Sequence, residues 1–267
     1  MSAYGPNAWV QQHWDWRAAT NFMLGGSGAG LLVVAAITMP SPDIAFQAAL
    51  LLVAGGLGAV WLEIGRKLRA AHVMFNPFTS WMTRESFAAG VLFAFGFAYF
   101  AWHQTWLLVA TALAACAFVH CQARILRASK GIPAWRMPEL EPLILSSALA
   151  EGAGAVLILD ARPITLALFA GAVIARGFAW SGYRNALRQP GAKVVLEPAG
   201  KALVRLGTVA PLALLVVATL LPEAAALAGI GAIAAIATGW RFKFVLVARA
   251  SFNQGFALPH LPVRGTR

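Results

Sequence analysis

Charged side chains are scarce in this chain. Only 12% of its 267 residues are charged, about half of the roughly 25% usual in soluble domains. Among the charged residues, acidic ones are rarer than basic ones, 10 against 21, which gives a net charge of +11. Hydrophobic residues make up 60%, and mean hydropathy is +0.70. This composition excludes an ordinary soluble domain and a disordered chain. In so apolar a chain, the basic excess indicates a membrane surface rather than a nucleic-acid partner.

Cysteine is also rare, since only Cys116 and Cys121 are present. Two cysteines exclude a disulfide scaffold and an iron–sulfur cluster held by this chain alone, because such a cluster takes four ligands. A b-type haem needs two axial ligands, commonly histidines from facing helices. His120 lies inside an apolar segment, and the one histidine able to join it, His72, lies in a connection. We therefore expect neither haem nor an iron–sulfur cluster in this chain.

Long apolar runs dominate the rest of the sequence. A helix of about 20 apolar residues spans a bilayer with all its backbone polar groups satisfied. We expect eight such helices, at Asn21–Met39, Ile44–Leu62, Ser86–Trp102, Trp106–Ile125, Leu143–Leu159, Pro163–Gly182, Ala202–Leu221 and Glu223–Phe242. The predicted fold is an all-α polytopic membrane protein. It has an N-terminal segment (1–20), one bundle (21–242) and a C-terminal tail (243–267).

The basic residues gather on one side of this topology. All but Arg162 and Arg176 of the 21 belong to the termini or to the second, fourth and sixth connections. Because basic residues are enriched on the cytoplasmic side of a membrane, we expect both termini to be cytoplasmic. We expect the tail residues Arg241, Lys243 and Arg249 at the interface. The glycine triplets Gly28–Gly30 and Gly152–Gly154 lie half a chain apart and hint at two four-helix units arranged as a parallel repeat.

The connection from Glu63 to Glu85 is the densest polar segment. A quinone site needs hydrogen-bond donors, a proton-exchanging group and an apolar route for the tail. The connection supplies those ingredients in His72, Arg84 and Glu85, beside Phe75, Phe78 and Trp81. The alternative interpretation is an interfacial loop, in which the arginines contact lipid phosphates and the tryptophans form the aromatic belt.

The stretch Gly65–Glu85, reading GRKLRAAHVMFNPFTSWMTRE, resembles the second loop of the dimethyl sulfoxide reductase anchor-subunit family. That family is related to the polysulfide reductase membrane subunits. The N-terminal Trp14–Arg17 and the C-terminal Asn253–Pro259 are similar to the phenylacetyl-CoA:acceptor oxidoreductase membrane-subunit branch. Glu63 and Lys67 depart from the pattern, which usually has histidine and proline there.

The resemblance implies a haem-free anchor in a bacterial inner membrane, with no catalytic residues of its own. Its partners would be a molybdopterin catalytic subunit and a four-cluster ferredoxin-like iron–sulfur subunit, which dock on the side of the N-terminus. The distribution of basic residues, and not the resemblance, predicts that this side is cytoplasmic. It would exchange electrons with ubiquinone or menaquinone. By the same resemblance, His72 and Glu85 lie near the quinone. Further candidates for shaping this site are Arg66, Trp81, Arg84, Trp16 and Arg17.

Two charges lie inside predicted spans, Glu151 and Arg176. Both lie roughly 10 Å deep at 1.5 Å per residue, and an unpaired charge there costs several kcal/mol. We expect a buried ion pair between them, or a proton route through Glu151. A polytopic small-molecule transporter remains the alternative function, because the first two spans are rich in glycine. A b-type cytochrome subunit is a weaker alternative.

Overall fold

The computed structural model describes residues 7–64 and 72–255. Eight of its helical stretches are long and apolar enough to cross a membrane, and the described residues form no β-sheet. The prediction of an all-α, eight-span fold is therefore confirmed. The elements in chain order are α1 (Trp16–Thr20), η1 (Asn21–Gly25), α2 (Gly26–Thr38), α3 (Asp43–Glu63), α4 (Trp81–Trp102), α5 (Thr105–Ala128), α6 (Leu140–Leu159), α7 (Pro163–Ala186), α8 (Pro190–Val204), η3 (Arg205–Val209), α9 (Ala210–Leu220), η4 (Pro222–Ala224), α10 (Ala226–Phe244) and η5 (Val245–Arg249).

Three spans contain a π-helical segment, in which the backbone is locally wider than in an α-helix. Segment η1 continues α1 into α2, η3 joins α8 to α9, and η5 ends the last span. A π-helical turn shifts the hydrogen-bonding register, so carbonyl groups there become available to side chains. Each of the three lies close to a buried polar group described below.

The seventh span begins much earlier than predicted, at Pro190 rather than Ala202. The polar residues between Pro190 and Ala202 predicted a connection between the sixth and seventh spans. They are instead the exposed face of an amphipathic helix, where Glu197 accepts hydrogen bonds from Arg184 of α7 at 2.9 Å. Pro190 occupies the first helical turn, where its missing N–H has no cost.

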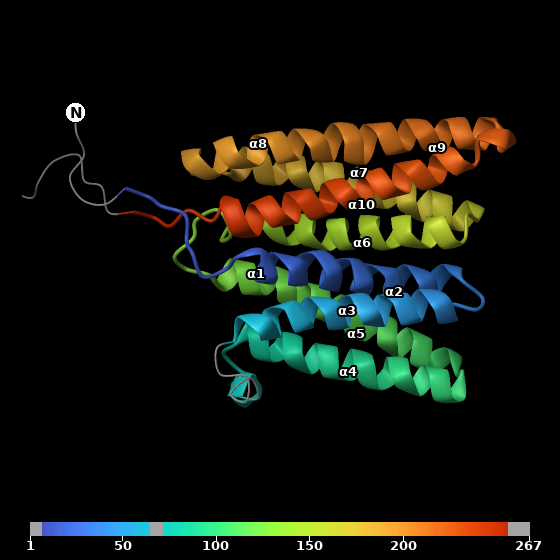
Figure 1. Ribbon diagram of the computed structural model, residues 1–267, viewed down its shortest axis with the longest axis horizontal. Helices are drawn as coiled ribbons and strands as arrows, with labels where there is room; N and C mark the ends of the chain where they lie inside the picture. Colours follow the sequence, from blue (N-terminus) through green and yellow to red (C-terminus); the bar gives the residue numbers. More distant parts are fainter. Residues whose placement is uncertain (1–6, 65–71, 256–267) are drawn as a thin grey trace, which may run out of the picture.

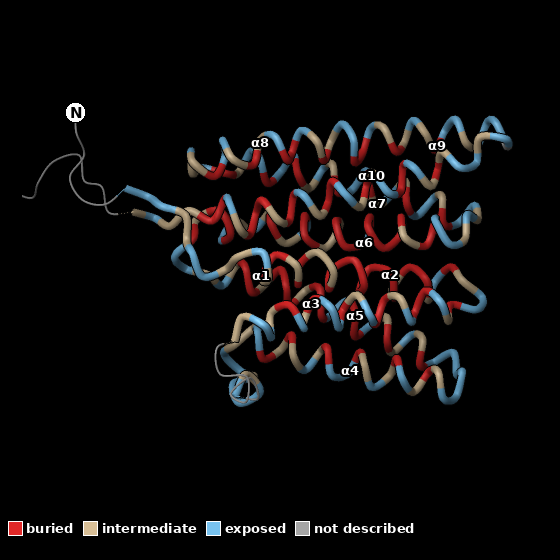
Figure 2. Tube along the Cα trace, viewed as in Figure 1, coloured by how far each residue is buried: buried red, intermediate tan, exposed pale blue. Residues whose placement is uncertain are grey.

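The helices form two groups of four spans (Figure 1). The first four spans, α1 to α5, lie on one side of the bundle, and the last four, α6 to α10, lie on the other. The groups meet where α2 packs against α6, and the burial colours show this seam as the core (Figure 2). A Cβ at Gly30 would overlap the carbonyl of Ala148, and one at Gly152 would overlap the backbone of Gly30. Gly30 and Gly152 therefore allow α2 and α6 to approach each other closely.

Both described ends of the chain lie at one end of the bundle, which we name the terminal face. Val10 bridges Phe252, and the Trp9 N–H donates to Asn253 Oδ1 at 3.0 Å. The terminal face also carries the connections that end in α4, α6 and α8 (Figure 1). Exposed basic side chains border it, namely Lys130, Arg136, Arg184, Arg188 and Lys193.

Candidate functional site

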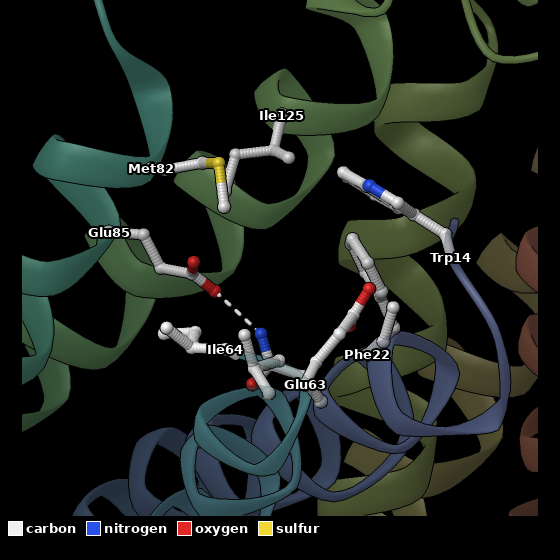
Figure 3. Close-up of a pocket in the computed structure, with 10 residues that line it drawn as sticks. Trp14, Phe22, Glu63, Ile64, Met82, Glu85 and Ile125 are labelled. Carbon is white, nitrogen blue, oxygen red and sulfur yellow. Dashed lines mark hydrogen bonds between the residues drawn. The ribbon is translucent and has the colours of Figure 1, made fainter. Parts of the chain in front are cut away.

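A cavity of about 250 Å³ opens at the terminal face between α1, α3, α4 and α5 (Figure 3). Its wall is mostly apolar, with carboxyl groups entering from the ends of α3 and α4. The lining residues are Trp14, Ala18, Asn21, Phe22, Val60, Glu63, Ile64, Met82, Glu85 and Ile125. Such a wall suits a flat, largely apolar ring with a few polar atoms at its edge.

Local sequence fixes Glu85 in the first turns of α4. Ser80 is the N-cap, and its hydroxyl accepts a hydrogen bond from the Thr83 N–H at 3.3 Å. Thr83 is buried and its hydroxyl donates to the carbonyl of Val73. Because the cap sets where the helix begins, it also sets the direction in which Glu85 leaves α4.

Glu85 is buried, with only 7% of the residue exposed. It accepts a hydrogen bond from Asn21 Nδ2 at 3.0 Å, as Figure 3 shows. Asn21 is the first residue of η1, and its own carbonyl accepts from Gln122 Nε2 at 3.1 Å. Asn21 Oδ1 and Gln122 Oε1 are buried without a partner among the described residues. A buried acceptor without a donor is costly, so these amide oxygens are suited to accept a hydrogen bond from a ligand or a water molecule.

A second polar cluster lies deeper in the bundle, at the seam between its halves. Lys243 Nζ donates to Glu151 Oε2 at 2.7 Å, and Ser27 Oγ donates to the same oxygen at 2.5 Å. Trp240 Nε1 donates to Ser27 Oγ at 2.8 Å. Glu151 and Lys243 are both 0% exposed. Glu151 is eleven residues from the start of α6, which places it about 16 Å from the terminal face.

Arg176 belongs to this cluster, but it is held differently from the prediction. Its Nη1 donates to the carbonyl of Ala235 at 2.9 Å and its Nη2 to that of Gly207 at 2.5 Å. Gly207 lies in η3, where the π-helical turn makes its carbonyl available. The cation paired with Glu151 is therefore Lys243 and not Arg176. The expectation that Lys243 lies at the interface is wrong, because its side chain turns into the core.

The two polar clusters meet at Gly26. A Cβ at Gly26 would lie 2.8 Å from Lys243 Nζ and 3.6 Å from Gln122 Oε1. The absent side chain thus leaves the Gln122 amide, which lies behind the cavity wall and donates to the Asn21 carbonyl, near the ammonium of the deeper cluster. Polar groups follow one another from Glu85 through Asn21 and Gln122 to the Glu151 pair.

Of the predicted site residues within the described part of the chain, Glu85 is the one that lines the cavity. His72 is exposed and packs edge-on against Phe75, with 5.6 Å between ring centroids. Arg84 donates to the carbonyls of Pro77 at 2.8 Å and Phe78 at 2.7 Å, so it closes the connection before α4.

The remaining predicted residues lie around the cavity mouth or away from it. Trp16 is 54% exposed, and Arg17 pairs with Asp15 at 2.9 Å. Trp81 packs against arginines of α4 and α5, outside the cavity wall. Arg66 lies outside the described residues.

Sequence reasoning missed Asn21, Gln122, Trp14 and Lys243. Asn21 and Gln122 could have been found from their position in the sequence, because they are amides within otherwise apolar spans. Polar side chains are costly there unless they have partners. Among the described residues, no group of three or more His, Cys, Asp or Glu is arranged to hold a metal ion. No protein-family model matches the chain, and no curated protein matches it either.

Proposed function

We propose that this chain is the membrane anchor and quinone-binding subunit of a molybdopterin and iron–sulfur oxidoreductase. The observation that carries the proposal is the cavity at the terminal face, with Glu85 and Asn21 in its otherwise apolar wall. Its volume of about 250 Å³ is near the lower end of small-molecule sites. It suits a head group whose isoprenoid tail leaves toward lipid.

The chemistry of the wall supports this assignment. Reduction of a quinone to a quinol takes up two electrons and two protons, and oxidation releases them. Two carboxyl groups line the cavity, Glu85 and Glu63, and a carboxyl group within hydrogen-bond reach of an oxygen can give or take a proton. Asn21 Nδ2 is a donor beside one of them, suited to hold a quinone oxygen in place.

Electrons would come from, or go to, a cluster in the ferredoxin-like partner at the terminal face. The cavity opens at that face, which exposed basic residues also border. The same basic residues support a cytoplasmic terminal face in a bacterial inner membrane. The molybdopterin subunit would then act on an intracellular substrate.

A small-molecule transporter is the second candidate, and the deeper cluster favours it. Transporters place interrupted helices and charged groups near the bilayer midplane. Here Glu151, Lys243 and Arg176 are fully buried, and π-helical segments interrupt three spans. The cluster is internally bonded, however, through Lys243, Ser27 and two backbone carbonyls. A structural role explains those contacts.

Purification from membranes in mild detergent tests the proposal. We expect two larger redox subunits and an isoprenoid quinone to accompany the chain. Ile64→Trp, which adds bulk in the cavity wall, should lower the quinone content of the assembly, whereas Ala117→Trp, on an exposed position of α5, should leave it unchanged. A solitary chain without quinone, or equal quinone in both variants, would refute the proposal.

A further inference from the structure

A second cavity, of about 260 Å³, lies beside the terminal face and is strongly basic. It is lined by Trp81, Arg124, Arg127, Ala128 and Arg136. Arg124, Arg127 and Ala128 form the last turns of α5, Trp81 begins α4, and Arg136 lies in the connection before α6. Three guanidinium groups therefore converge on one hollow at the end of the membrane-spanning region.

The acidic groups paired there do not balance this charge. Glu141 accepts from Arg127 Nη1 at 2.5 Å and lies 3.6 Å from Arg124 Nη1. Arg124 Nε is buried without a hydrogen-bond partner among the described residues. Arg136 donates to a backbone carbonyl, that of Lys130, at 3.4 Å. Among the residues that the structure describes, one carboxylate thus pairs with Arg124 and Arg127 and none pairs with Arg136, so the cavity can accommodate an anion.

Trp81 gives the cavity a fixed wall. The guanidinium of Arg84 lies 4.2 Å from its ring centroid and that of Arg124 lies 4.7 Å from it. Cation–π contacts at these distances hold the guanidinium groups in place. Arg124 lines the cavity, and held in this way it can present N–H groups to a bidentate acceptor such as phosphate, whereas Arg84 donates to the carbonyls of Pro77 and Phe78.

An apolar groove of about 300 Å³ continues from this region toward the middle of the bilayer. It runs between α2, α5 and α6 and is lined by Ala29, Gly30, Val33, Ala115, Cys116, Val119, His120, Leu145, Ala148 and Leu149. His120 connects the two hollows, because it lines the groove, its Nδ1 lies 3.0 Å from Glu141, and its ring packs edge-on against Trp81.

The two hollows follow one face of α5. Cys116, His120, Arg124 and Arg127 recur at spacings of four, four and three residues, which places them on the same side of the helix. Eleven residues separate Cys116 from Arg127, or about 16 Å along the axis. The basic cavity at the interface and the apolar groove beyond it together extend over this distance, which fits an anionic head group followed by the first part of an acyl chain.

We propose that this face of α5 is a binding site for an anionic phospholipid. The phosphate occupies the cavity of Arg124, Arg127 and Arg136, and one acyl chain lies in the groove past Cys116. A quinone head group is neutral and does not use the uncompensated arginines. A free phosphate ion would bind the same arginines but not the groove, so the groove distinguishes a phospholipid from free phosphate.

Lipid binding to the purified protein in detergent micelles tests the proposal. The probes are phosphatidylglycerol, phosphatidylcholine and inorganic phosphate, followed by native mass spectrometry and by thermal stabilisation. We expect phosphatidylglycerol to bind most tightly. A basic residue near a membrane surface contributes about fivefold to affinity for anionic lipid. Arg124→Gln combined with Arg136→Gln should therefore lower phosphatidylglycerol affinity roughly 25-fold.

Two control variants separate the site from general charge and bulk. Arg188→Gln removes an exposed cation at the terminal face, away from the cavity, and should change affinity less than about twofold. Cys116→Trp should weaken phosphatidylglycerol binding by filling the groove, whereas Ala117→Trp, exposed on the same helix, should not. Equal binding of the two lipids would overturn the proposal. An equal loss in Arg188→Gln, or inorganic phosphate stabilising as much as lipid and unaffected by Cys116→Trp, would also overturn it.

Discussion

Replacing Lys243 with methionine tests the buried ion pair at the seam of the bundle. The ammonium lies 2.7 Å from Glu151, and both side chains are 0–1% exposed. Removing one partner of a buried pair leaves a charge without compensation, at about 3–5 kcal/mol. Arg176 Nη1 and Glu151 Oε1 both border Gly239, so a second cation remains near the carboxylate. We therefore expect a loss of about 3 kcal/mol, at the lower end of that range.

The free energy of unfolding in mixed micelles, followed by circular dichroism as denaturing detergent is added, measures this loss. Lys201→Met is the matched control, because the Lys201 side chain is 61% exposed and its Nζ lies 3.8 Å from Glu197 Oε1. An exposed ion pair contributes about 1 kcal/mol or less. Adding Glu151→Gln to Lys243→Met should restore part of the stability, because no buried carboxylate is then left unpaired. If Lys243→Met costs no more than Lys201→Met, the pair does not stabilise the seam.

Three further outcomes are expected. Gly30→Val should destabilise the bundle by about 2 kcal/mol or more, because the added side chain forces α2 away from α6. Gly58→Val, with open space around it, should change the unfolding free energy by about 0.5 kcal/mol at most. Equal effects of the two substitutions would contradict the close packing of α2 and α6. Glu85→Gln should lower quinone turnover of the native assembly about a hundredfold while the unfolding midpoint stays near that of the wild type, and unchanged turnover would remove Glu85 from the proton transfer. The hydrogen bond from Arg17 holds the pKa of Asp15 below its usual range. The Asp15–Arg17 ion pair therefore stabilises the fold above about pH 4, and this stabilisation is lost as the pH falls through the lowered pKa of Asp15 in the folded protein. Below that pKa, the difference in melting temperature between wild type and Asp15→Asn should vanish.

The number of spans could be predicted from the sequence because bilayer thickness and backbone hydrogen bonding leave few alternatives for an apolar run. The start of the seventh span could not. Lys193, Glu197 and Lys201 indicated a polar connection, yet they form one face of a helix whose opposite face buries Leu196 and Leu203. A count of charges does not report which side of a helix they occupy.

The candidate site was predictable only in part. Glu85 follows from a polar motif at a span boundary. The connection to Asn21 depends on how α1 and η1 pack beside α4, which local sequence does not determine. Lys243 looked like an interfacial residue because it follows an apolar run and lies between Arg241 and Arg249. Its burial results from Glu151 on a helix 92 positions away, a tertiary contact with no local signature.

Photolabelling of the native assembly with an azido-quinone tests the central claim most directly. After illumination, peptides are mapped by mass spectrometry in the wild type and in Ile64→Trp. We predict adducts on the cavity wall at the terminal face, around Ile64 and Met82, with loss of labelling in the variant. Labelling confined to the α6–α10 half, or equal labelling in the variant, would contradict a quinone site beside Glu85.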